Sequence, residues 1–376
     1  MIKKILFSKP FIGKYEKIFV NRVFDNKKFT DGEFQNKAKN VIGSMIKSKC
    51  LELTHSCSSA LEISMLLIDL KKGDEVIMPS YTFTSTANAV LLRGGKPVFV
   101  DVSPHDVNLN YKLVEKKINQ KTKAIIVVHY AGIACDMNNF LKLKKKHKIF
   151  LIEDAAHAFL GKFDNKFLGT IGDFGAFSFH ETKNFIGGQC GALSINDPKY
   201  IKKAQIILDK GTDRSFVDNK KKYYSWKGIG SEYRATELSS ALLCGQLKNY
   251  KKILSSRKLI WNKYSKELSQ IKSDKFYLLQ NHNFLKKNAY HVFALIFNSL
   301  KYRDKYIKFM KKNNIDCYFH YYPLHMSKFG KIFKSHDLSV SEKIYNGLVR
   351  LPLYPSLKKS ELNRIILTSK KFLKLI

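Results

Sequence analysis

The sequence predicts an α/β fold in which a mostly parallel sheet is covered by helices on both faces. Between about residues 50 and 200, short apolar runs alternate with amphipathic segments. Strands that alternate with helices along a chain form parallel sheets with helical cover. The length of 376 residues favours about two domains, at roughly 100–200 residues each.

Six short apolar runs are predicted to be strands, at residues 75–78, 97–101, 124–129, 149–153, 175–179 and 191–195. The segments between them repeat apolar residues at helical spacing. These predicted helices cover residues 58–70, 86–93, 111–118 and 136–147.

A second pattern follows the alternating region. It consists of a long amphipathic stretch, a strand-like run, a helix-like run and a last helix, at residues 236–271, 290–297, 302–312 and 359–376. We therefore predict a large α/β domain in residues 1–245 and a smaller α+β domain in residues 246–376.

The chain is strongly basic, with 67 Lys and Arg against 31 Asp and Glu and a net charge of +36. Such a charge is typical of nucleic-acid binding proteins. The lysines are spread along the whole chain and form no single basic arm, so we favour a general attraction for anionic substrates and expect no nucleic-acid partner.

The six cysteines are scattered, without a C-x-x-C pair or the Cys/His spacing of a zinc site. This pattern predicts a reduced, cytoplasmic protein without a structural metal. The apolar stretch near the start covers only residues 5–7, which is too short for a signal peptide. No run of 18 apolar residues exists, so we expect no membrane insertion.

Three segments at expected strand ends carry polar residues suited to chemistry. Ser58 and Ser59 begin a helix, where they either cap it or bind a phosphate. The apolar run that begins at residue 150 ends in two acids, Glu153 and Asp154. These acids are either loop caps or carboxylates that face a cation. Ser178 and Lys183 follow the next run and precede a glycine-rich turn.

Together these segments provide a phosphate cup, a carboxylate and an amine, with an aromatic segment between the cup and the carboxylate. Pyridoxal 5′-phosphate (PLP) needs a phosphate anchor, a ring stack, a carboxylate beside the pyridine nitrogen and a lysine for the Schiff base. The combination is more specific than any of its parts, and it predicts a PLP enzyme.

The chain resembles the sugar aminotransferases named for their DegT, DnrJ, EryC and StrS members. The motifs that carry the resemblance are residues 74–83 (DEVIMPSYTF), 153–157 (EDAAH) and 178–184 (SFHETKN). Within the family, the chain is most similar to the dTDP-4-amino-4,6-dideoxygalactose transaminase branch. That likeness depends on residues 78–88, 129–132 (HYAG), 179–184, 210–214 (KGTDR) and 319–325 (FHYYPLH).

The resemblance implies a role for each of several residues. Lys183 is the Schiff-base lysine and Asp154 the carboxylate beside the pyridine nitrogen, and both are catalytic. His157 contacts the ring hydroxyl and Phe83 stacks on the ring. The implied phosphate ligands are Ser58, Ser59 and Ser178, and the implied sugar-nucleotide ligands are Arg214, His320 and Tyr321. The implied fold is aspartate-aminotransferase-like, and the implied assembly is a homodimer with shared active sites.

The implied reaction moves the amino group of L-glutamate to a dTDP-4-keto-6-deoxyhexose and gives the 4-amino-4,6-dideoxyhexose, in the galactose configuration. The implied pathway is the synthesis of surface polysaccharide such as lipopolysaccharide. Alternatives within the family are amination at C3, a UDP- or GDP-linked sugar, and a dehydratase, in which a histidine replaces the lysine. A non-catalytic, nucleic-acid binding protein with the PLP fold is the alternative from another class.

The chain departs from the family pattern at three places, and one of them is that residues 210–214 match only the narrower branch. Cys190 follows Gln189 in a turn where many members have glycine, so we expect the backbone shape of this turn to differ. Glu232 replaces an asparagine that reaches the neighbour's phosphate, and a carboxylate cannot take that role. We interpret His291 as an ordinary surface or core residue and Trp226 as a packing residue. His325 is as well explained by packing as by a place in the sugar site.

Overall fold

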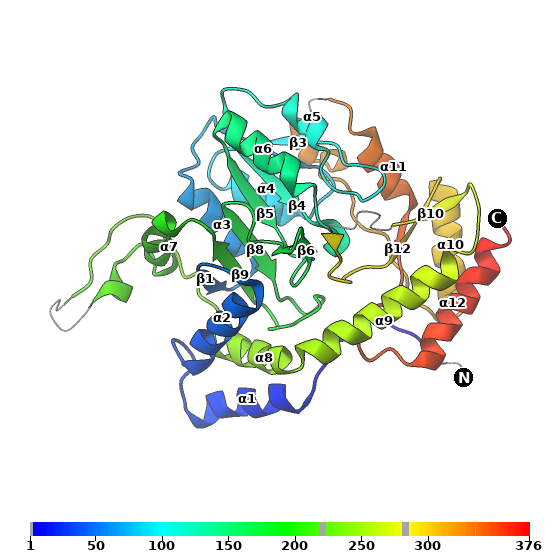
Figure 1. The fold of residues 1–376 in the computed structure, drawn as a ribbon, viewed down its shortest axis with the longest axis horizontal. Helices are drawn as coiled ribbons and strands as arrows, with labels where there is room; N and C mark the ends of the chain where they lie inside the picture. Colours follow the sequence, from blue (N-terminus) through cyan, green and yellow to red (C-terminus); the bar gives the residue numbers. More distant parts are fainter. Residues whose placement is uncertain (1–2, 218–222, 280–285, 335) are drawn as a thin grey trace.

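The computed structural model describes residues 3–217, 223–279, 286–334 and 336–376. Its centre is a seven-stranded sheet in the order β1-β9-β8-β5-β4-β2-β3. Strands β3, β2, β4, β5 and β8, in this spatial order, pair in parallel with their neighbours. Strand β9 pairs antiparallel with both β8 and β1. The predicted fold class, a mostly parallel sheet between helices, is confirmed (Figure 1).

The strands and helices of this sheet lie within a few residues of their predicted positions. The strands are β1 (Leu51–Thr54), β2 (Glu75–Pro79), β3 (Lys96–Val100), β4 (Thr122–Val128), β5 (Phe150–Asp154), β8 (Phe174–Ser178) and β9 (Gly191–Ile195). The helices are α3 (Cys57–Leu67), α4 (Thr84–Leu91), α5 (Tyr111–Glu115), α6 (Met137–His147) and α7 (Ile201–Leu208). The sequence prediction missed β1, which runs directly into the serine-rich helix start, and α7.

The two faces of the sheet bury different helices, because alternate residues of a strand point to opposite sides. Ile125 and Val127 of β4 belong to a cluster that includes residues of α2 (Glu33–Ile46), α6 and α8 (Glu237–Lys248). Ala124 and Ile126 of the same strand belong to a second cluster, with residues of α3, α4 and α7. The central strands are therefore buried on both faces, which explains why they appear in the sequence as continuous apolar runs.

Four strand ends meet at one edge of the sheet. Since β2, β4, β5 and β8 are parallel, their carboxyl ends lie side by side. Ser80 follows β2, His129 follows β4, Asp154 ends β5, and Ser178 ends β8. The loops that continue from this edge carry most of the polar residues predicted to be functional.

The stretch predicted as one amphipathic segment over residues 236–271 folds as two consecutive helices, α8 (Glu237–Lys248) and α9 (Tyr250–Leu268). Helix α8 packs against the N-terminal helices α1 (Lys14–Asp25) and α2 (Glu33–Ile46). Helix α9 continues away from them towards the C-terminal region (Figure 1). The predicted domain boundary after residue 245 falls within α8, and it stays a prediction.

The C-terminal region forms a second core around a three-stranded antiparallel sheet. Its strands are β10 (Phe276–Leu278), β12 (Ala294–Phe297) and β13 (Leu348–Arg350), and its helices are α10 (Leu300–Lys312), α11 (Ser339–Gly347) and α12 (Lys359–Leu373). The strand predicted over residues 290–297 begins only at Ala294. Tyr290 has a φ of 53°, which is incompatible with an extended strand at that position. Short strands β6 (Lys162–Phe163), β7 (Lys166–Phe167) and β11 (Lys286–Lys287) form a third, small sheet.

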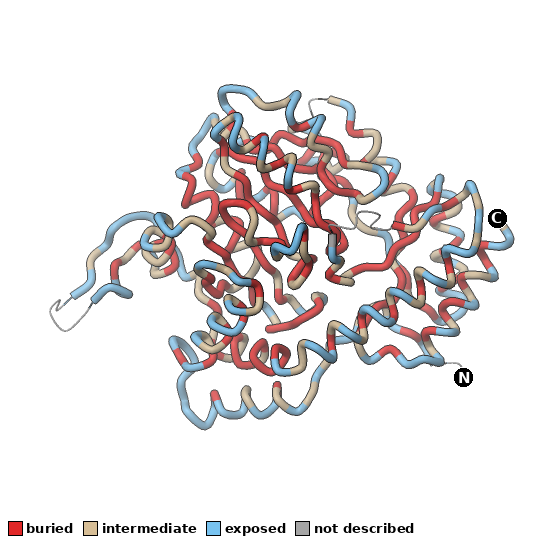
Figure 2. The backbone as a smooth tube through the Cα atoms, viewed as in Figure 1, coloured by how far each residue is buried: buried red, intermediate tan, exposed pale blue. Residues whose placement is uncertain are grey.

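Residues 209–217 and 223–236, between α7 and α8, extend from the body of the molecule, and we call them the arm (Figure 1). The described part of the arm is largely exposed (Figure 2). Trp226, which we interpreted as a packing residue, is 81% exposed here, so that interpretation is wrong for this chain on its own. Among the described residues, no helix is both long and apolar enough to cross a membrane.

Candidate active site

A cavity of about 560 Å³ lies between the carboxyl edge of the large sheet and the C-terminal region. One side of it, the large-domain wall, is formed by the loops after the strand ends and by the starts of α3 and α4. The other side, the small-domain wall, is formed by residues 7–8, by Arg257, and by residues near positions 291, 320 and 350.

Lys183 enters this cavity from the loop after β8. Its backbone N–H donates to the carbonyl of His180 at 2.9 Å, which closes a turn and fixes where the side chain starts. Burial lowers the pKa of the Lys183 amine to about 8, although the nearby Cys57 and Asp154 raise it. A lysine with a lowered pKa is partly neutral near physiological pH and can act as a nucleophile and as a base.

Asp154 faces the same cavity from the end of β5. Its carboxylate accepts hydrogen bonds from the Thr86 hydroxyl at 2.9 Å and from the Ala156 N–H at 3.1 Å. Burial raises the pKa of Asp154, while these two donors and the charge of Lys183 lower it. A buried carboxylate of this kind is stabilised by a cation placed beside it.

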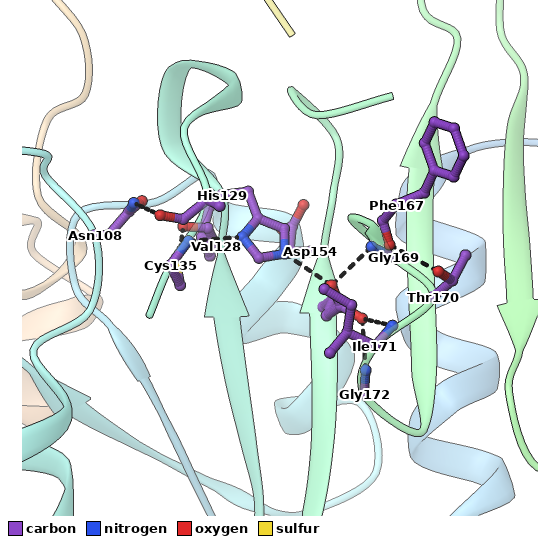
Figure 3. Close-up of polar contacts among 12 residues, drawn as sticks. Asn108, Val128, His129, Cys135, Asp154, Phe167, Gly169, Thr170, Ile171 and Gly172 are labelled. Carbon is purple, nitrogen blue, oxygen red and sulfur yellow. Dashed lines mark hydrogen bonds and ion pairs between the residues drawn. The ribbon is translucent and has the colours of Figure 1, made fainter. Parts of the chain in front are cut away.

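A second carboxylate holds the end of β5 from behind. Glu153 accepts hydrogen bonds from three backbone N–H groups, those of Gly169, Ile171 and Gly172, at 2.6–2.7 Å (Figure 3). His129 Nδ1 accepts from the Cys135 N–H at 3.1 Å, so His129 Nε2 carries the ring proton and donates to Glu153 at 3.0 Å. The His129 and Glu153 side chains are fully buried, and the network restricts the position of Asp154.

The starts of α3 and α4 meet at another part of the cavity. Ser56 caps α3, and the Ser58 hydroxyl donates to the Ser85 hydroxyl of α4 at 2.6 Å. Two helix N-termini with free N–H groups and hydroxyls suit a phosphate. Gly191 is required next to this site, because a Cβ there would lie 2.3 Å from the backbone of Ser56.

Closely spaced rings line the cavity where the two walls meet. The His157 and His291 rings lie 4.4 Å apart, and the His157 and Tyr321 rings are nearly parallel at 6.3 Å. Burial, followed by nearby positive charges, lowers the pKa values of His157, His291 and His320 well below the ordinary value, so these rings are neutral. The Phe83 ring lies 6.2 Å from that of Tyr321 and is 58% exposed.

Two arginines line the small-domain wall of the cavity. Arg257 of α9 donates to the backbone carbonyls of Tyr290 at 3.0 Å and His291 at 2.7 Å. Arg350, at the end of β13, stacks over the Phe7 ring at 4.7 Å and donates to the Phe319 carbonyl at 3.2 Å. Sequence reasoning missed both arginines and His291. A charged residue inside the otherwise apolar run 348–351 was the available signal for Arg350.

The residues present fit PLP. The cavity brings together an amine, a buried carboxylate, and hydroxyls at two helix starts. His157 Nδ1 is buried and has no hydrogen-bond partner among the described residues, as expected for an atom that contacts a cofactor oxygen. Lys183, Asp154 and His157 would hold the reactive end and the ring, and Ser58 and Ser178 would hold the phosphate.

A family model matches residues 10–369, and its description is the DegT/DnrJ/EryC1/StrS aminotransferase family. The chain belongs to this family. It is therefore a PLP-dependent sugar aminotransferase, and the cofactor and enzyme class predicted from the sequence are confirmed.

Similar proteins agree with this assignment. The chain is 27% identical to a GDP-perosamine synthase of Escherichia coli O157:H7, over 96% of both chains. It is 28% identical to the spore coat polysaccharide biosynthesis protein SpsC of Bacillus subtilis, over 96% of this chain and 95% of that one. The PLP form of a putative sugar aminotransferase from Streptococcus pneumoniae superposes with a TM-score of 0.91 at 25% identity, with 99% of each chain covered.

In this aminotransferase, eight of the ten predicted site residues line the cavity. They are Ser58, Phe83, Asp154, His157, Ser178, Lys183, His320 and Tyr321. The other two lie outside its lining: Ser59 bonds with the capping Ser56, and Arg214 is exposed on the arm, 3.9 Å from Asp31.

Three further sequence interpretations have an outcome. His325 is buried away from the cavity, where it bonds to Ser80 and Glu342, so the packing interpretation holds. Cys190 keeps a backbone without positive φ, and its side chain is buried in the core, so the turn accepts it. Glu232 forms an ion pair with Lys210 on the arm.

Proposed function

We propose that this aminotransferase transfers the amino group of L-glutamate to C4 of a dTDP-4-keto-6-deoxyhexose. The product would be the dTDP-4-amino-4,6-dideoxyhexose with the galactose configuration, made for a surface polysaccharide such as lipopolysaccharide. The observation that carries the chemistry is the placement of Lys183 and Asp154 in one cavity, on neighbouring strand ends of the large sheet.

In this proposal each residue of the large-domain wall has a separate task. PLP, when bound, supplies a carbon that takes up amines and a ring that accepts electrons. The Lys183 amine would take the proton from the α-carbon of the donor and deliver it to the cofactor, and with the sugar it would move a proton in the opposite direction. The negative charge of Asp154 would keep a proton on the pyridine nitrogen. His157 Nδ1 would contact the ring hydroxyl, and Ser58 and Ser178 would hold the phosphate.

The choice of substrate depends on two segments that resemble the 4-amino-4,6-dideoxygalactose branch. Residues 319–325 carry His320 and Tyr321 into the cavity, where rings and a hydroxyl can contact a sugar. Residues 210–214 lie on the arm, and the planar guanidinium of Arg214 suits a phosphate. The relative named GDP-perosamine synthase favours a second candidate, a GDP-linked 4-keto sugar.

A substrate panel tests the proposal. Purified enzyme, PLP and L-glutamate would be mixed with dTDP-4-keto-6-deoxyglucose, its 3-keto isomer, and UDP- and GDP-linked 4-keto sugars, and products would be read by mass spectrometry and NMR. We expect kcat/KM to favour the dTDP-4-keto sugar by at least tenfold, which is about 1.4 kcal/mol. A tenfold preference for another member would replace the substrate and leave the reaction class unchanged.

We also propose a homodimer whose subunits complete each other's active sites through the arm. The arm exposes large apolar side chains, with Tyr223 at 74%, Trp226 at 81% and Ile229 at 64%. Exposed aromatic groups of this density are typical of a surface that another chain covers. Light scattering, with activity followed on dilution, tests this, and a fully active monomer would disprove it.

The proposed location is the cytoplasm. None of the six cysteines, all of which lie in the described part of the chain, forms a disulfide bond, and four of them are buried. Six thiols without a disulfide fit a reducing compartment. Fractionation of the native host with an antibody against the chain would test the location.

A further inference from the structure

A segment before α1 connects the C-terminal region with α8. It covers residues 3–11, and we call it the strap. At its start, the Ile5 N–H donates to the Asn314 carbonyl at 2.8 Å, and the Ile5 carbonyl accepts from the Asp316 N–H at 3.0 Å. The Ile5 side chain is buried in the core of the C-terminal region. The start of the strap is therefore fixed to that region.

The other end of the strap is bound to α8. The buried Gln246 of α8 donates from Nε2 to the Phe11 carbonyl at 2.7 Å. At the first end, Arg364 of α12 donates to the Lys3 carbonyl at 2.7 Å. Helices α8 and α12 lie towards opposite ends of α9 (Figure 1). The strap therefore spans the space between two parts of the molecule that pack separately.

The middle of the strap lines the active-site cavity. The chain bends at Phe7, and both Phe7 and Ser8 belong to the cavity lining. The Phe7 ring packs edge-on against that of Tyr318, with 5.3 Å between the ring centroids, and the Arg350 guanidinium lies over it at 4.7 Å. These contacts fix Phe7, and they place Ser8 beside residues 319–325, the segment proposed to contact the sugar.

The Ser8 hydroxyl differs from the other serine and threonine hydroxyls of the cavity. Among the described residues, no group forms a hydrogen bond with it. A hydroxyl that faces a cavity is satisfied by water until a ligand group replaces that water. The others all have partners within the large-domain wall; they belong to Ser56, Ser58, Thr82, Ser85, Ser178 and Thr182.

The chemistry of a serine distinguishes between the molecules that enter the cavity. The polar groups of PLP are already assigned to residues of the large-domain wall. L-glutamate presents an ammonium and two carboxylates, which charged partners bind most strongly. A hexose ring presents neutral hydroxyls, and each of them both donates and accepts, as the Ser8 hydroxyl does. Ser8 therefore matches the sugar better than the donor or the cofactor.

We propose that Ser8 is a specificity-determining residue whose hydroxyl forms a hydrogen bond with a ring hydroxyl of the keto sugar. This inference rests on the proposed function, because it adds a contact to the same sugar site. The strap thereby supplies the site with a residue from a third part of the chain, besides the strand ends and the C-terminal loops.

The test uses the PLP-loaded enzyme and three variants. Ser8→Ala removes the hydroxyl, Ser8→Thr keeps it, and Ser360→Ala is the matched control. Ser360 is exposed at the start of α12 and does not line the cavity. Thermal melting of each variant checks that it is folded. The sugar is the member of the substrate panel with the highest kcat/KM, whichever nucleotide it carries.

The first readout is the absorbance change of each half-reaction at increasing concentrations of L-glutamate or of the keto sugar. We expect Ser8→Ala to weaken the apparent affinity for the keto sugar about threefold to tenfold, because one neutral hydrogen bond is lost. The half-reaction with L-glutamate should be unchanged. Ser8→Thr should keep most of the sugar affinity, and Ser360→Ala should keep all of it.

The second readout identifies the partner of Ser8. Analogues of the sugar that each lack one ring hydroxyl are compared in the wild type and in Ser8→Ala. For one analogue, the wild type should lose the same factor in affinity that Ser8→Ala loses with the complete sugar. Ser8→Ala should lose nothing further with that analogue, since the two changes remove the same hydrogen bond.

Each other outcome has a defined meaning. An unchanged sugar affinity in folded Ser8→Ala overturns the inference, and the proposed function stands. A loss confined to the L-glutamate half-reaction places Ser8 at the donor and also overturns it, as do additive losses with every analogue. If the wild type aminates no keto sugar of the panel, the proposed function is wrong, and the sugar contact is wrong with it.

Discussion

The two walls of the cavity differ in how they are built. The large-domain wall takes Asp154, Ser178 and Lys183 from the ends of neighbouring strands and from the loop that follows. The small-domain wall takes Phe7, Arg257, His291, His320 and Arg350 from segments far apart in the chain. The first wall follows from the sheet, while the second depends on how remote segments pack.

The two walls are also held in place differently. Backbone N–H groups around Glu153 restrain the large-domain wall behind Asp154. A chain of side-chain hydrogen bonds connects the end of β2 with α11, from Ser80 to His325 at 2.5 Å and from His325 to Glu342 of α11 at 3.0 Å. The comparison suggests that the large-domain wall performs the chemistry and that the small-domain wall chooses and orients what is bound.

The largest expected effect lies on the large-domain wall, at Lys183. We expect Lys183→Ala to lower turnover by roughly 10³-fold or more, because the amine moves the proton in both half-reactions. Borohydride reduction and peptide mapping of the wild type should place the pyridoxyl label on Lys183. The exposed Lys166 provides the control, since Lys166→Ala should keep both activity and label. A label on another lysine would disprove the assignment.

Asp154→Asn should produce the next largest loss. We expect turnover to fall by roughly 10²-fold or more while the cofactor remains bound, because an amide cannot stabilise a protonated ring nitrogen. Stopped-flow absorbance would measure both half-reactions, and dialysis would measure retention of the cofactor. Asp197→Asn, at an exposed carboxylate that pairs with Lys199, is the control. Near-normal turnover in Asp154→Asn would place the essential carboxylate elsewhere.

The pH dependence of PLP binding to Lys183 tests an electrostatic interaction between the two walls. The lowered pKa of Lys183, about 8, means that the neutral amine increases tenfold per pH unit below 8 and levels off above it. In cofactor-free protein, the rate of PLP capture should follow this curve when measured by absorbance. Arg350→Gln should move the midpoint upwards, since the charge of Arg350 lowers the pKa of Lys183. A midpoint near 10.5, the ordinary value for lysine, would contradict the structure.

The smallest effect is expected at His325, which holds the small-domain wall without touching the cavity. His325→Asn should raise the KM of the keto sugar a few-fold and lower the free energy of unfolding by about 1–3 kcal/mol, because Ser80 and Glu342 lose a partner. The half-reaction with L-glutamate should keep its rate. Steady-state kinetics and denaturant unfolding measure these effects, with His336→Asn as the control. An equal loss in both half-reactions would show that the two walls are not separable.

The large sheet was predicted well from the sequence because local apolar patterns mark its individual strands. Strands such as β4 and β5 are buried on both faces and therefore appear as continuous apolar runs. The regular α/β alternation then places Asp154 and the loop of Lys183 at one edge of the sheet. The sequence was less informative where the backbone conformation of a single residue sets the start of a strand. Tyr290 has a positive φ, and β12 therefore begins further along the chain than predicted.

By itself, then, the sequence determined the fold class, the family and the polar residues at the strand ends. Only the tertiary structure decided that Arg257 and Arg350 line the cavity, that His291 faces it, and that His325 does not. Strand ends of a parallel sheet are neighbours by geometry, so local patterns are enough to bring them together. Arg257, His291 and Arg350 become neighbours only when separate helices and strands pack, and the contacts that satisfy or expose a side chain arise at that stage.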